Sequence, residues 1–260
     1  MSDTPVKRPL TVAHRGGAGL APENTLAAFR KAVELKCDAV ELDLHLSKDG
    51  VPMVIHDPEV SGTTDGRGEV SALTRAELET LNAAAKFTGG MVQPQRIPTL
   101  DEVFRMVRGK AEVQIEIKRR ADQTRYAGIE TQVLDTVRRH DMLPAVMIIS
   151  FDFPTLQDIK RLAPTARTCA LISSSYVKQF HAWWKPEAVA DDLAAHGLDC
   201  VGVHFSRLTK RLLNALRARH FRVGVWTVNE ASALRKFVEM GVDFITSDRP
   251  DLLQEVLRMP

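Results

Sequence analysis

Short β-rich runs alternate with helical patterns from one end of this 260-residue chain to the other. The eight runs that we expect to be barrel strands are Leu10–His14, Ala39–Leu46, Glu112–Ile117, Val146–Phe151, Arg167–Ile172, Cys200–Phe205, Arg222–Val228 and Asp243–Ser247. Because each crossover helix returns the chain to the same end, such strands run parallel. A doubly wound open sheet usually has fewer strands, whereas eight strand–helix repeats suit a closed barrel. The pattern therefore predicts an α/β fold of the TIM-type (β/α)8 kind.

Helical periodicity fills the intervals between the strands. The helices that we expect are Thr25–Leu35, Leu100–Val107, Gly128–His140, Thr155–Leu162, Glu187–His196, Leu208–Arg219, Ala231–Met240 and Leu252–Leu257. Thr99 stands just before one of them and has the hydroxyl side chain of an N-cap residue. These helices would form the outer ring of the barrel.

An additional β-segment and an irregular stretch interrupt the alternation after the second strand. Val51–His56 follows across Lys48-Asp49-Gly50, and Asp-Gly is a strong hairpin signal. Residues 58–98 are rich in glycine and proline around one helical stretch, Thr74–Ala85. A segment of about 40 residues with so little strand pattern is too short for an independent core. We expect residues 1–260 to form a single domain, with residues 58–98 as a small insertion at one end of the barrel.

Acidic and basic residues are interspersed and nearly balanced, with a formal net charge of +2. This balance favours neither a nucleic-acid-binding face nor a polybasic membrane anchor. The N-terminal residues lack an apolar core of signal-peptide length, and no stretch reaches the roughly 18 apolar residues of a membrane span. We expect a soluble, cytoplasmic protein. Its three widely spaced cysteines, Cys37, Cys169 and Cys200, lack a CxxC pair and are expected to be buried and reduced.

Three carboxylates stand on neighbouring expected strands. Glu41 and Asp43 are two positions apart, so their side chains point to the same side of a strand, and Glu116 follows on the next barrel strand. Such like charges repel unless a positive group lies among them. Oxygen ligands of this kind suit a hard divalent cation, Mg²⁺ or Ca²⁺. The alternative is a set of structural ion pairs with Lys118, Arg15 or Lys48.

Two histidines and two cations occur at the same end of the expected strands. His14 and His56 titrate near neutrality, which suits general acid–base chemistry. Arg15 and Lys118 are the natural phosphate contacts, since arginine binds two oxygens and lysine acts as a point charge. Asp57 directly follows His56, and strand alternation would turn it away, so we expect it to cap the following turn.

Other catalytic patterns are missing from the sequence. It contains no GxxxxGK[ST] loop for nucleotide phosphates and no GxSxG elbow for a serine nucleophile. The remaining histidines, His45, His140, His181, His196 and His220, show no partner pattern and are interpreted as surface or packing residues. The aromatic cluster Tyr176, Phe180, Trp183 and Trp184 is interpreted as one side of a short helix packed on the barrel, with a lid or subunit contact as the alternative.

Several short motifs together resemble the glycerophosphodiester phosphodiesterase family. They are His14-Arg15-Gly16, Pro22-Glu23-Asn24-Thr25, Glu41-x-Asp43, Lys48-Asp49-Gly50, His56-Asp57, Ile97-Pro98-Thr99-Leu100, Glu116-Ile117-Lys118, Ser150-Phe151, Trp226-Thr227-Val228-Asn229 and Ile245-Thr246-Ser247-Asp248. Their order and spacing cover nearly the whole chain. One departure is Gly62, where many members carry arginine, and another is Ser47 in place of a frequent threonine; neither is expected to take part in the chemistry.

The resemblance implies a TIM-type barrel that hydrolyses glycerophosphodiesters, such as glycerophosphocholine or glycerophosphoethanolamine, to an alcohol and sn-glycerol 3-phosphate. By the resemblance, His14 and His56 are the acid–base pair. It implies that Glu41, Asp43 and Glu116 bind Mg²⁺ or Ca²⁺. The same resemblance makes Arg15 and Lys118 phosphate contacts and Trp226 a surface on which the substrate stacks. Glu23 and Asn24 would line or brace the site.

Several questions stay open at this stage. The nucleophile is either the adjacent glycerol hydroxyl, which gives a cyclic phosphate that water then opens, or water itself. A lysophospholipase-D-like phosphodiesterase would share the fold and metal site but need an apolar groove. A catalytically silent binding barrel would usually lack some of these residues. The sequence leaves the preferred alcohol, the choice between the two metals and the formation of a homo-oligomer undecided.

Overall fold

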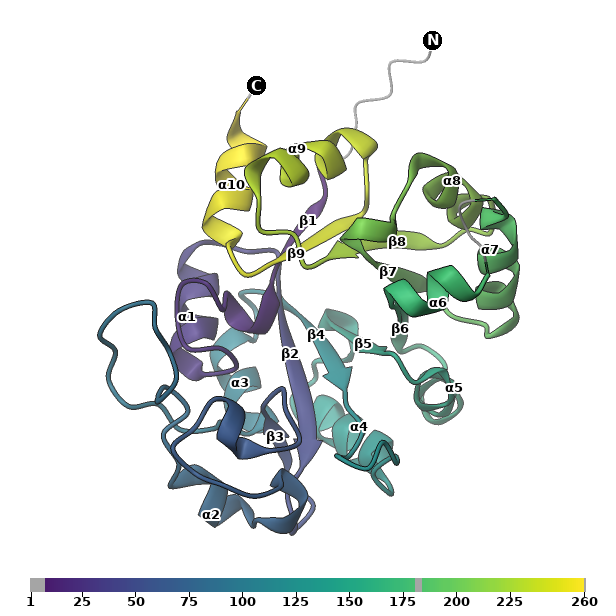
Figure 1. Ribbon diagram of the computed structural model, residues 1–260. Helices are drawn as coiled ribbons and strands as arrows, with labels where there is room; N and C mark the ends of the chain where they lie inside the picture. The colour runs from purple at the N-terminus through teal and green to yellow at the C-terminus, as the bar shows by residue number, and fades with distance from the viewer. Residues whose placement is uncertain (1–7, 181–183, 260) are drawn as a thin grey trace.

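Eight parallel strands close into a barrel in the computed structural model, which describes residues 8–180 and 184–259 (Figure 1). The barrel strands are β1 (Leu10–Ala13), β2 (Ala39–Leu46), β4 (Glu112–Ile117), β5 (Val146–Ser150), β6 (Arg167–Ile172), β7 (Cys200–His204), β8 (Arg222–Trp226) and β9 (Phe244–Ser247). Pairing of β1 with both β9 and β2 completes the circle. The predicted TIM-type barrel is confirmed.

Helices surround the barrel as the alternation predicted (Figure 1). Their bounds are α1 (Leu26–Glu34), α2 (Arg75–Glu79), α3 (Leu100–Val107), α4 (Ile129–Arg139), α5 (Phe153–Leu162), α6 (Ser174–Gln179), α7 (Pro186–Ala195), α8 (Lys210–Ala218), α9 (Ala231–Met240) and α10 (Pro250–Arg258). Thr99 caps α3 as predicted, and Glu102 completes a capping box by accepting from the backbone N–H of Thr99. Each side chain thereby satisfies a backbone donor at the start of the helix.

The apolar side chains form two layers on the two sides of the barrel wall. The larger layer lies between strands and helices and includes Phe29, Phe104 and Phe237, which are fully buried. The inner layer fills the barrel itself with Val12, Ala39, Met147, Ile149, Cys169, Leu171, Cys200 and Phe244. All eight residues of β2 are buried, since both faces of a barrel strand are covered. Cys37, Cys169 and Cys200 are free and buried, as expected.

The amino-terminal ends of the strands are tied together by aspartates that stand just before them. Asp38 precedes β2, and its Oδ2 accepts hydrogen bonds from the backbone nitrogen and the hydroxyl of Thr11 on β1, at 2.7 and 2.8 Å. Asp199 makes the same pair of bonds to Thr168 on β6, each at 3.0 Å. These contacts satisfy backbone donors at the end of the barrel opposite to the strands' carboxyl ends.

The segment between β3 (Pro52–Val54) and α3 follows the antiparallel pairing of β3 with β2. Its short 3₁₀ helices η2 (Val60–Gly62) and η3 (Val70–Ala72) and α2 enclose a small apolar cluster of Met53, Ile55, Val60, Val70, Leu78, Ala83 and Ile97. This cluster shares Met53 with β3, so the segment packs on the barrel through the hairpin. We keep the interpretation of residues 58–98 as an insertion within a single domain.

The predicted helix Thr74–Ala85 is wrong in length, because α2 ends at Glu79. The side-chain oxygen of Asn82 accepts hydrogen bonds from the backbone nitrogens of Ala84 and Gln95, at 3.0 and 3.1 Å. Asparagine competes in this way with the helical hydrogen-bond pattern and holds a turn. The predicted strand Val51–His56 is likewise shorter, since pairing with β2 covers only Pro52–Val54.

The aromatic cluster after β6 divides into packed and exposed members. Tyr176 in α6 lies 5.1 Å from Phe180 and 5.6 Å from Phe153, measured between ring centroids, and all three pack on the core. The interpretation of a packed helical side is therefore correct for Tyr176 and Phe180. Trp184 is exposed, at 74%, and Trp183 and His181 lie outside the described residues. Within the described part of the chain, no helix combines the length and apolar character needed to span a membrane.

Candidate active site

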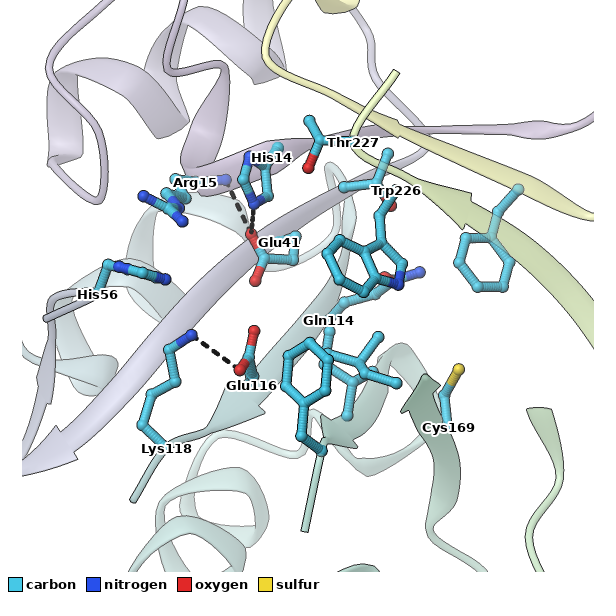
Figure 2. Close-up of a pocket in the computed structure, with 15 residues that line it drawn as sticks. His14, Arg15, Glu41, His56, Gln114, Glu116, Lys118, Cys169, Trp226 and Thr227 are labelled. Atoms are coloured by element: carbon cyan, nitrogen blue, oxygen red, sulfur yellow. Dashed lines mark hydrogen bonds and ion pairs between the residues drawn. The ribbon is translucent and has the colours of Figure 1, made fainter. Parts of the chain in front are cut away.

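The predicted site residues gather around one cavity at the carboxyl ends of the strands (Figure 2). We call this space, of about 190 Å³, the mouth cavity; it is lined by His14, Arg15, Glu41, His56, Gln114, Glu116, Lys118, Ile149, Phe151, Cys169, Leu171, Trp226, Thr227, Phe244 and Thr246. Catalytic residues of TIM-type barrels occupy this end of the fold. Asp43 is not among the lining residues, but its Oδ1 lies 3.0 Å from Nζ of Lys118, which is.

The three carboxylates predicted to hold a metal lie together at one wall of the cavity. Asp43 of β2 and Glu116 of β4 are register partners, and Glu41 lies two residues before Asp43 on the same face. One oxygen from each carboxylate lies within 4.8 Å of the others, and all three side chains are buried. Oxygen ligands so close together have the spacing and chemistry for a single divalent cation.

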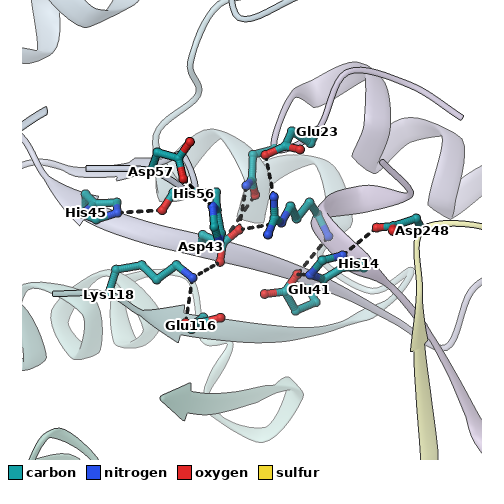
Figure 3. A network of polar contacts seen from close by, with 12 residues as sticks. His14, Glu23, Glu41, Asp43, His45, His56, Asp57, Glu116, Lys118 and Asp248 are labelled. Atoms are coloured by element: carbon teal, nitrogen blue, oxygen red, sulfur yellow. Dashed lines mark hydrogen bonds and ion pairs between the residues drawn. The ribbon is translucent and has the colours of Figure 1, made fainter. Parts of the chain in front are cut away.

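Two cations partly neutralise this cluster: Lys118, which contacts both Asp43 and Glu116 (Figure 3), and Arg15. Lys118 Nζ lies 2.8 Å from Glu116 Oε1 and 3.0 Å from Asp43 Oδ1, and Arg15 Nε lies 3.4 Å from Asp43 Oδ2. Of the three cations that the sequence offered as ion-pair partners for the carboxylates, Lys118 and Arg15 therefore do contact them. Lys48 forms no ion pair within the described residues. Asp43 Oδ1 is buried, and none of the described residues donates a hydrogen bond of good geometry to it.

Burial and neighbouring charges shift the pKa values of the three carboxylates in different directions. Burial raises the pKa of Glu41, and the neighbouring Asp43 raises it further. Burial also raises the pKa of Glu116, although Lys118 opposes the shift. For Asp43, burial acts in the same direction, but the charges of Lys118 and Arg15 prevail and lower the pKa. A divalent cation would supply the missing positive charge, so the residues present fit such an ion.

His14 is fixed by contacts on both ring nitrogens. Its Nδ1 lies 2.6 Å from Asp248 Oδ1, and its Nε2 lies 3.9 Å from Glu41 Oε2. Burial would lower the histidine pKa, but the hydrogen bond to Asp248 and the charge of Glu41 raise it overall. Asn229 in turn donates to Asp248 Oδ2 at 2.6 Å and accepts from the Asp248 backbone nitrogen at 2.9 Å. A chain of hydrogen bonds therefore sets the orientation of the ring.

His56 has an equivalent partner, contrary to the interpretation of Asp57 as a turn cap. Its Nδ1 lies 2.7 Å from Asp57 Oδ1. Strand alternation does not apply to this pair, because β3 ends at Val54 and both residues follow it. Gly62 also belongs to this arrangement, since a Cβ at that position would lie 2.3 Å from Asp57 Oδ2. The glycine that departs from the family pattern thus leaves room for the carboxylate beside His56.

The interpretation of His45 as a surface or packing residue is correct in that the side chain packs inside the protein, but it does have polar partners. The side chain is buried, with Nδ1 2.8 Å from the Tyr126 hydroxyl and Nε2 3.0 Å from the backbone oxygen of His56. Because the His56 carbonyl can only accept, Nε2 carries the proton and Nδ1 accepts from Tyr126. Burial lowers the pKa of His45 to about 4. This neutral histidine holds the backbone of His56 in place.

The loop between β1 and α1 supplies Arg15 and its supports. Arg15 has a φ of 50°, and its backbone nitrogen donates to Glu41 Oε2 at 2.9 Å. Its guanidinium donates to Glu23 Oε1 at 2.9 Å. Asn24 donates to Asp43 Oδ2 at 2.8 Å and accepts from the Asp43 backbone nitrogen at 3.3 Å. Glu23 and Asn24 therefore brace the cation and one carboxylate of the site.

An aromatic wall stands opposite the charged one. Trp226 ends β8, and its ring nitrogen donates to the Gly202 backbone oxygen at 3.0 Å. Phe151 meets it edge to face, with 5.4 Å between ring centroids. Sequence reasoning missed Gln114 and Thr227 as lining residues. Gln114 could have been found, because it lies two residues before Glu116 on the same strand face.

The chain is similar to known proteins in both sequence and structure. The glycerophosphoryl diester phosphodiesterase family matches residues 14–252. The glycerophosphodiester phosphodiesterase of Caldanaerobacter subterraneus subsp. tengcongensis is 32% identical over 249 residues, which cover 96% of this chain and 98% of that protein. The crystal structure of a glycerophosphodiester phosphodiesterase from Agrobacterium tumefaciens has a TM-score of 0.76 at 28% identity, covering 95% of this chain and 99% of that one.

A phosphodiesterase from Oleispira antarctica, solved in complex with the product sn-glycerol-3-phosphate, has a TM-score of 0.81 at 26% identity and covers 97% of this chain and 98% of its own. The family match spans all the motifs that carried the resemblance, from His14 to Asp248. Both the sequence relatives and the solved structures thus confirm the resemblance, and the chain belongs to the glycerophosphoryl diester phosphodiesterase family of phosphodiester hydrolases.

Proposed function

We propose that this enzyme hydrolyses glycerophosphodiesters, such as glycerophosphocholine and glycerophosphoethanolamine, to an alcohol and sn-glycerol 3-phosphate, with a divalent cation and two histidines. The observation that carries the proposal is the placement of His14 and His56 beside the three buried carboxylates, each histidine with Nδ1 held by an aspartate. The product bound by the Oleispira antarctica neighbour supports the same chemistry here.

Both histidines can transfer protons through Nε2. When Nδ1 donates its proton to Asp248 or Asp57, the neutral ring has its free lone pair at Nε2. Nε2 can then accept a proton from the attacking hydroxyl or, when protonated, donate one to the departing alcohol. One histidine serves as base and the other as acid. The attacking group is either the adjacent glycerol hydroxyl or water.

The charged wall of the cavity binds the phosphate in this proposal. Arg15 and Lys118 contact the phosphodiester oxygens and orient the phosphorus between the histidines. A divalent cation bound by Glu41, Asp43 and Glu116 would supply positive charge that offsets the charge developing on those oxygens. Trp226 presents its ring to the carbon atoms of the substrate, and Phe151 supports that ring.

The decisive assay measures glycerol 3-phosphate released from glycerophosphocholine with Mg²⁺, with Ca²⁺ and with EDTA. Metal-dependent release that EDTA abolishes would establish the reaction and identify the activating ion. A folded sample that releases none with either metal, nor from glycerophosphoethanolamine, would contradict the proposal. Release of choline from lysophosphatidylcholine alone would instead indicate the lysophospholipase-D-like activity. A complete absence of turnover on all of these substrates would support the alternative of a catalytically silent binding barrel.

A further inference from the structure

A second cavity opens beside the catalytic residues, on the side of the loop that follows β4. We call this space, of about 340 Å³, the side cavity. It shares His56, Glu116, Lys118 and Phe151 with the mouth cavity, so the two spaces meet at the proposed phosphate position. Besides Asp57, which holds His56, its lining includes charged and polar side chains that none of the catalytic roles uses: Arg119, Arg120, Gln123 and Asp152.

The acidic side chains of the side cavity already have partners. Asp57 is bonded to His56. Asp152 is paired with Arg119, and its other oxygen lies 3.3 Å from Arg125 Nε. The negative charge of Asp152 is therefore compensated by two arginines, whereas Asp57 uses one oxygen to hold the imidazole of His56.

Arg120 differs from the other charged residues of this cavity in its contacts. Among the described residues its guanidinium forms no ion pair, and the side chain is half-buried. The guanidinium instead lies 5.6 Å from the centre of the Tyr126 ring and 3.5 Å from the hydroxyl of Ser71. The carboxylate of Asp122, two residues along, accepts from the nitrogen and hydroxyl of Thr124 instead. The direct contacts of the guanidinium are thus with neutral groups, and the charge of Asp122 acts on it from nearby.

The backbone around Arg120 fixes its place. Its nitrogen donates to the Thr124 oxygen at 2.9 Å, and its oxygen accepts from the Gln123 nitrogen at 2.9 Å. These bonds close a tight loop directly after Lys118, the proposed phosphate contact. Guanidinium groups bind carboxylates and phosphates in a two-pronged geometry, and an unpaired one beside a phosphate site suits a second anionic group.

The two cavities differ in the part of the substrate that they suit. The mouth cavity is the smaller, and beyond the catalytic groups it presents neutral side chains that are mostly apolar, with Gln114, Thr227 and Thr246 as polar members. Such groups suit the invariant, uncharged glycerol half, whose hydroxyls need hydrogen-bond partners. The larger side cavity, with its charged lining, suits the alcohol half, which varies between substrates.

We propose that the side cavity binds the alcohol half of the substrate and that Arg120 makes the enzyme prefer alcohols that carry an anionic group, a carboxylate or a second phosphate. An alcohol that carries only an ammonium group meets the like charge of Arg120 there. This inference rests on the proposed function and adds the class of alcohol. Arg120 acts as a specificity-determining residue at a distance from the reacting atoms.

The test compares glycerophosphoserine with glycerophosphoethanolamine, because these two diesters differ only by one carboxylate. The quantity measured is the ratio of their kcat/KM values, serine over ethanolamine, from the release of glycerol 3-phosphate. We expect a ratio of about ten in the unaltered enzyme, as one charge-assisted contact gives. Glycerophosphoglycerol phosphate serves as a second anionic substrate, which tells whether phosphate replaces carboxylate.

Three variants separate the role of Arg120 from a structural one. Arg120→Gln should bring the ratio close to one, and Arg120→Lys should retain several-fold preference because it keeps the charge. Arg235→Gln, an exposed arginine of α9, is the matched control and should leave both rates unchanged. Thermal unfolding of each variant checks that the fold is kept.

The outcomes are distinguishable from a failure of the proposed function. Turnover of both diesters with a ratio near one, or a ratio that Arg120→Gln leaves unchanged, would overturn this inference and leave the function standing. Hydrolysis of no glycerophosphodiester at all would overturn both. If Arg120→Gln does not fold, the ratio is measured in the folded Arg120→Lys variant at low and at high salt. A preference that is present at low salt and lost at high salt supports the charge contact, whereas a ratio that does not depend on salt contradicts it.

Discussion

His14 and Asp248 stand 234 positions apart in the chain, yet His14 Nδ1 lies 2.6 Å from Asp248 Oδ1. The contact joins the end of the first barrel strand to the end of the last one, and it exists because β1 pairs with β9 when the barrel closes. The same contact leaves Nε2 of His14 facing Glu41. Asp248 is therefore expected to act as a positioning residue for His14.

Asp248→Asn should lower kcat about 10- to 100-fold while KM changes less than about threefold, because the amide no longer fixes the histidine tautomer by charge. Steady-state kinetics with glycerophosphocholine measures the split. Asp141→Asn is the control, since Asp141 is an exposed residue with a φ of 54° that asparagine tolerates. A rise in KM alone would show that Asp248 serves substrate binding instead.

His56→Ala should cut turnover by roughly 10²–10⁴ and leave folding intact, because the proposed proton transfer loses its side chain. The side chain is partly exposed, so its removal leaves no large internal hole. His220→Asn is the control, because His220 is exposed and has a φ of 63°. Turnover within a factor of two of the unaltered enzyme would remove His56 from the mechanism.

Divalent metal should raise the melting temperature of the enzyme by several degrees, since ligand at about 100 times its Kd stabilises the folded state by about 2.7 kcal/mol. Glu41→Gln should abolish most of this shift together with the activity. Without metal, the same variant should be at least as stable as the unaltered protein, because it removes one of three repelling buried carboxylates. Equal melting temperatures in EDTA, Mg²⁺ and Ca²⁺ for the unaltered enzyme would argue against the metal site.

Asp38→Ala should reduce the free energy of unfolding by about 1–3 kcal/mol, because the buried backbone nitrogen of Thr11 loses its acceptor. Activity should stay within a factor of two, since Asp38 lies at the end of the barrel opposite to the site. Urea unfolding measures the loss, with Asp135→Ala, an exposed change in α4, as the control. A large fall in kcat without a fall in stability would contradict this division between the two ends.

The thiol of Cys37 is expected to make the stability of the folded protein depend on pH. Burial raises the pKa of its thiol to about 12, well above the ordinary value for cysteine. The unfolded chain therefore loses this proton from about pH 9, while the folded protein keeps it. The stability that the protonated thiol contributes to the folded state is complete below pH 9 and is lost as the pH rises towards 12.

Between pH 7.5 and pH 10, the unaltered protein should lose about 1 kcal/mol more stability than Cys37→Ala. Urea unfolding at both pH values measures the difference, in which the other titrating groups cancel. The thiol should also resist iodoacetamide at pH 8 until the protein is unfolded. Equal losses in the two proteins, or rapid alkylation of Cys37 in the folded state, would count against a buried, protonated thiol.

The local pattern of the chain determined the barrel and most of its site. Strand and helix periods are properties of neighbouring residues, so the alternation alone predicted β2, β4, β6, α3 and α9 with their observed bounds. The spacing of Glu41 and Asp43 placed both carboxylates on one face for the same reason. The carboxyl ends of parallel strands meet at one mouth, which is why Glu116 could be added from another strand.

Only the tertiary structure decided which side chains are partners. The bonds of His14 to Asp248 and of His45 to Tyr126 join segments far apart in sequence, and they depend on strand register and on closure of the barrel. The contact of Asp57 with His56 arises where the strand has ended and the period of two no longer applies. The unpaired charge of Arg120 is likewise invisible locally, because it depends on which carboxylates other residues have already bound.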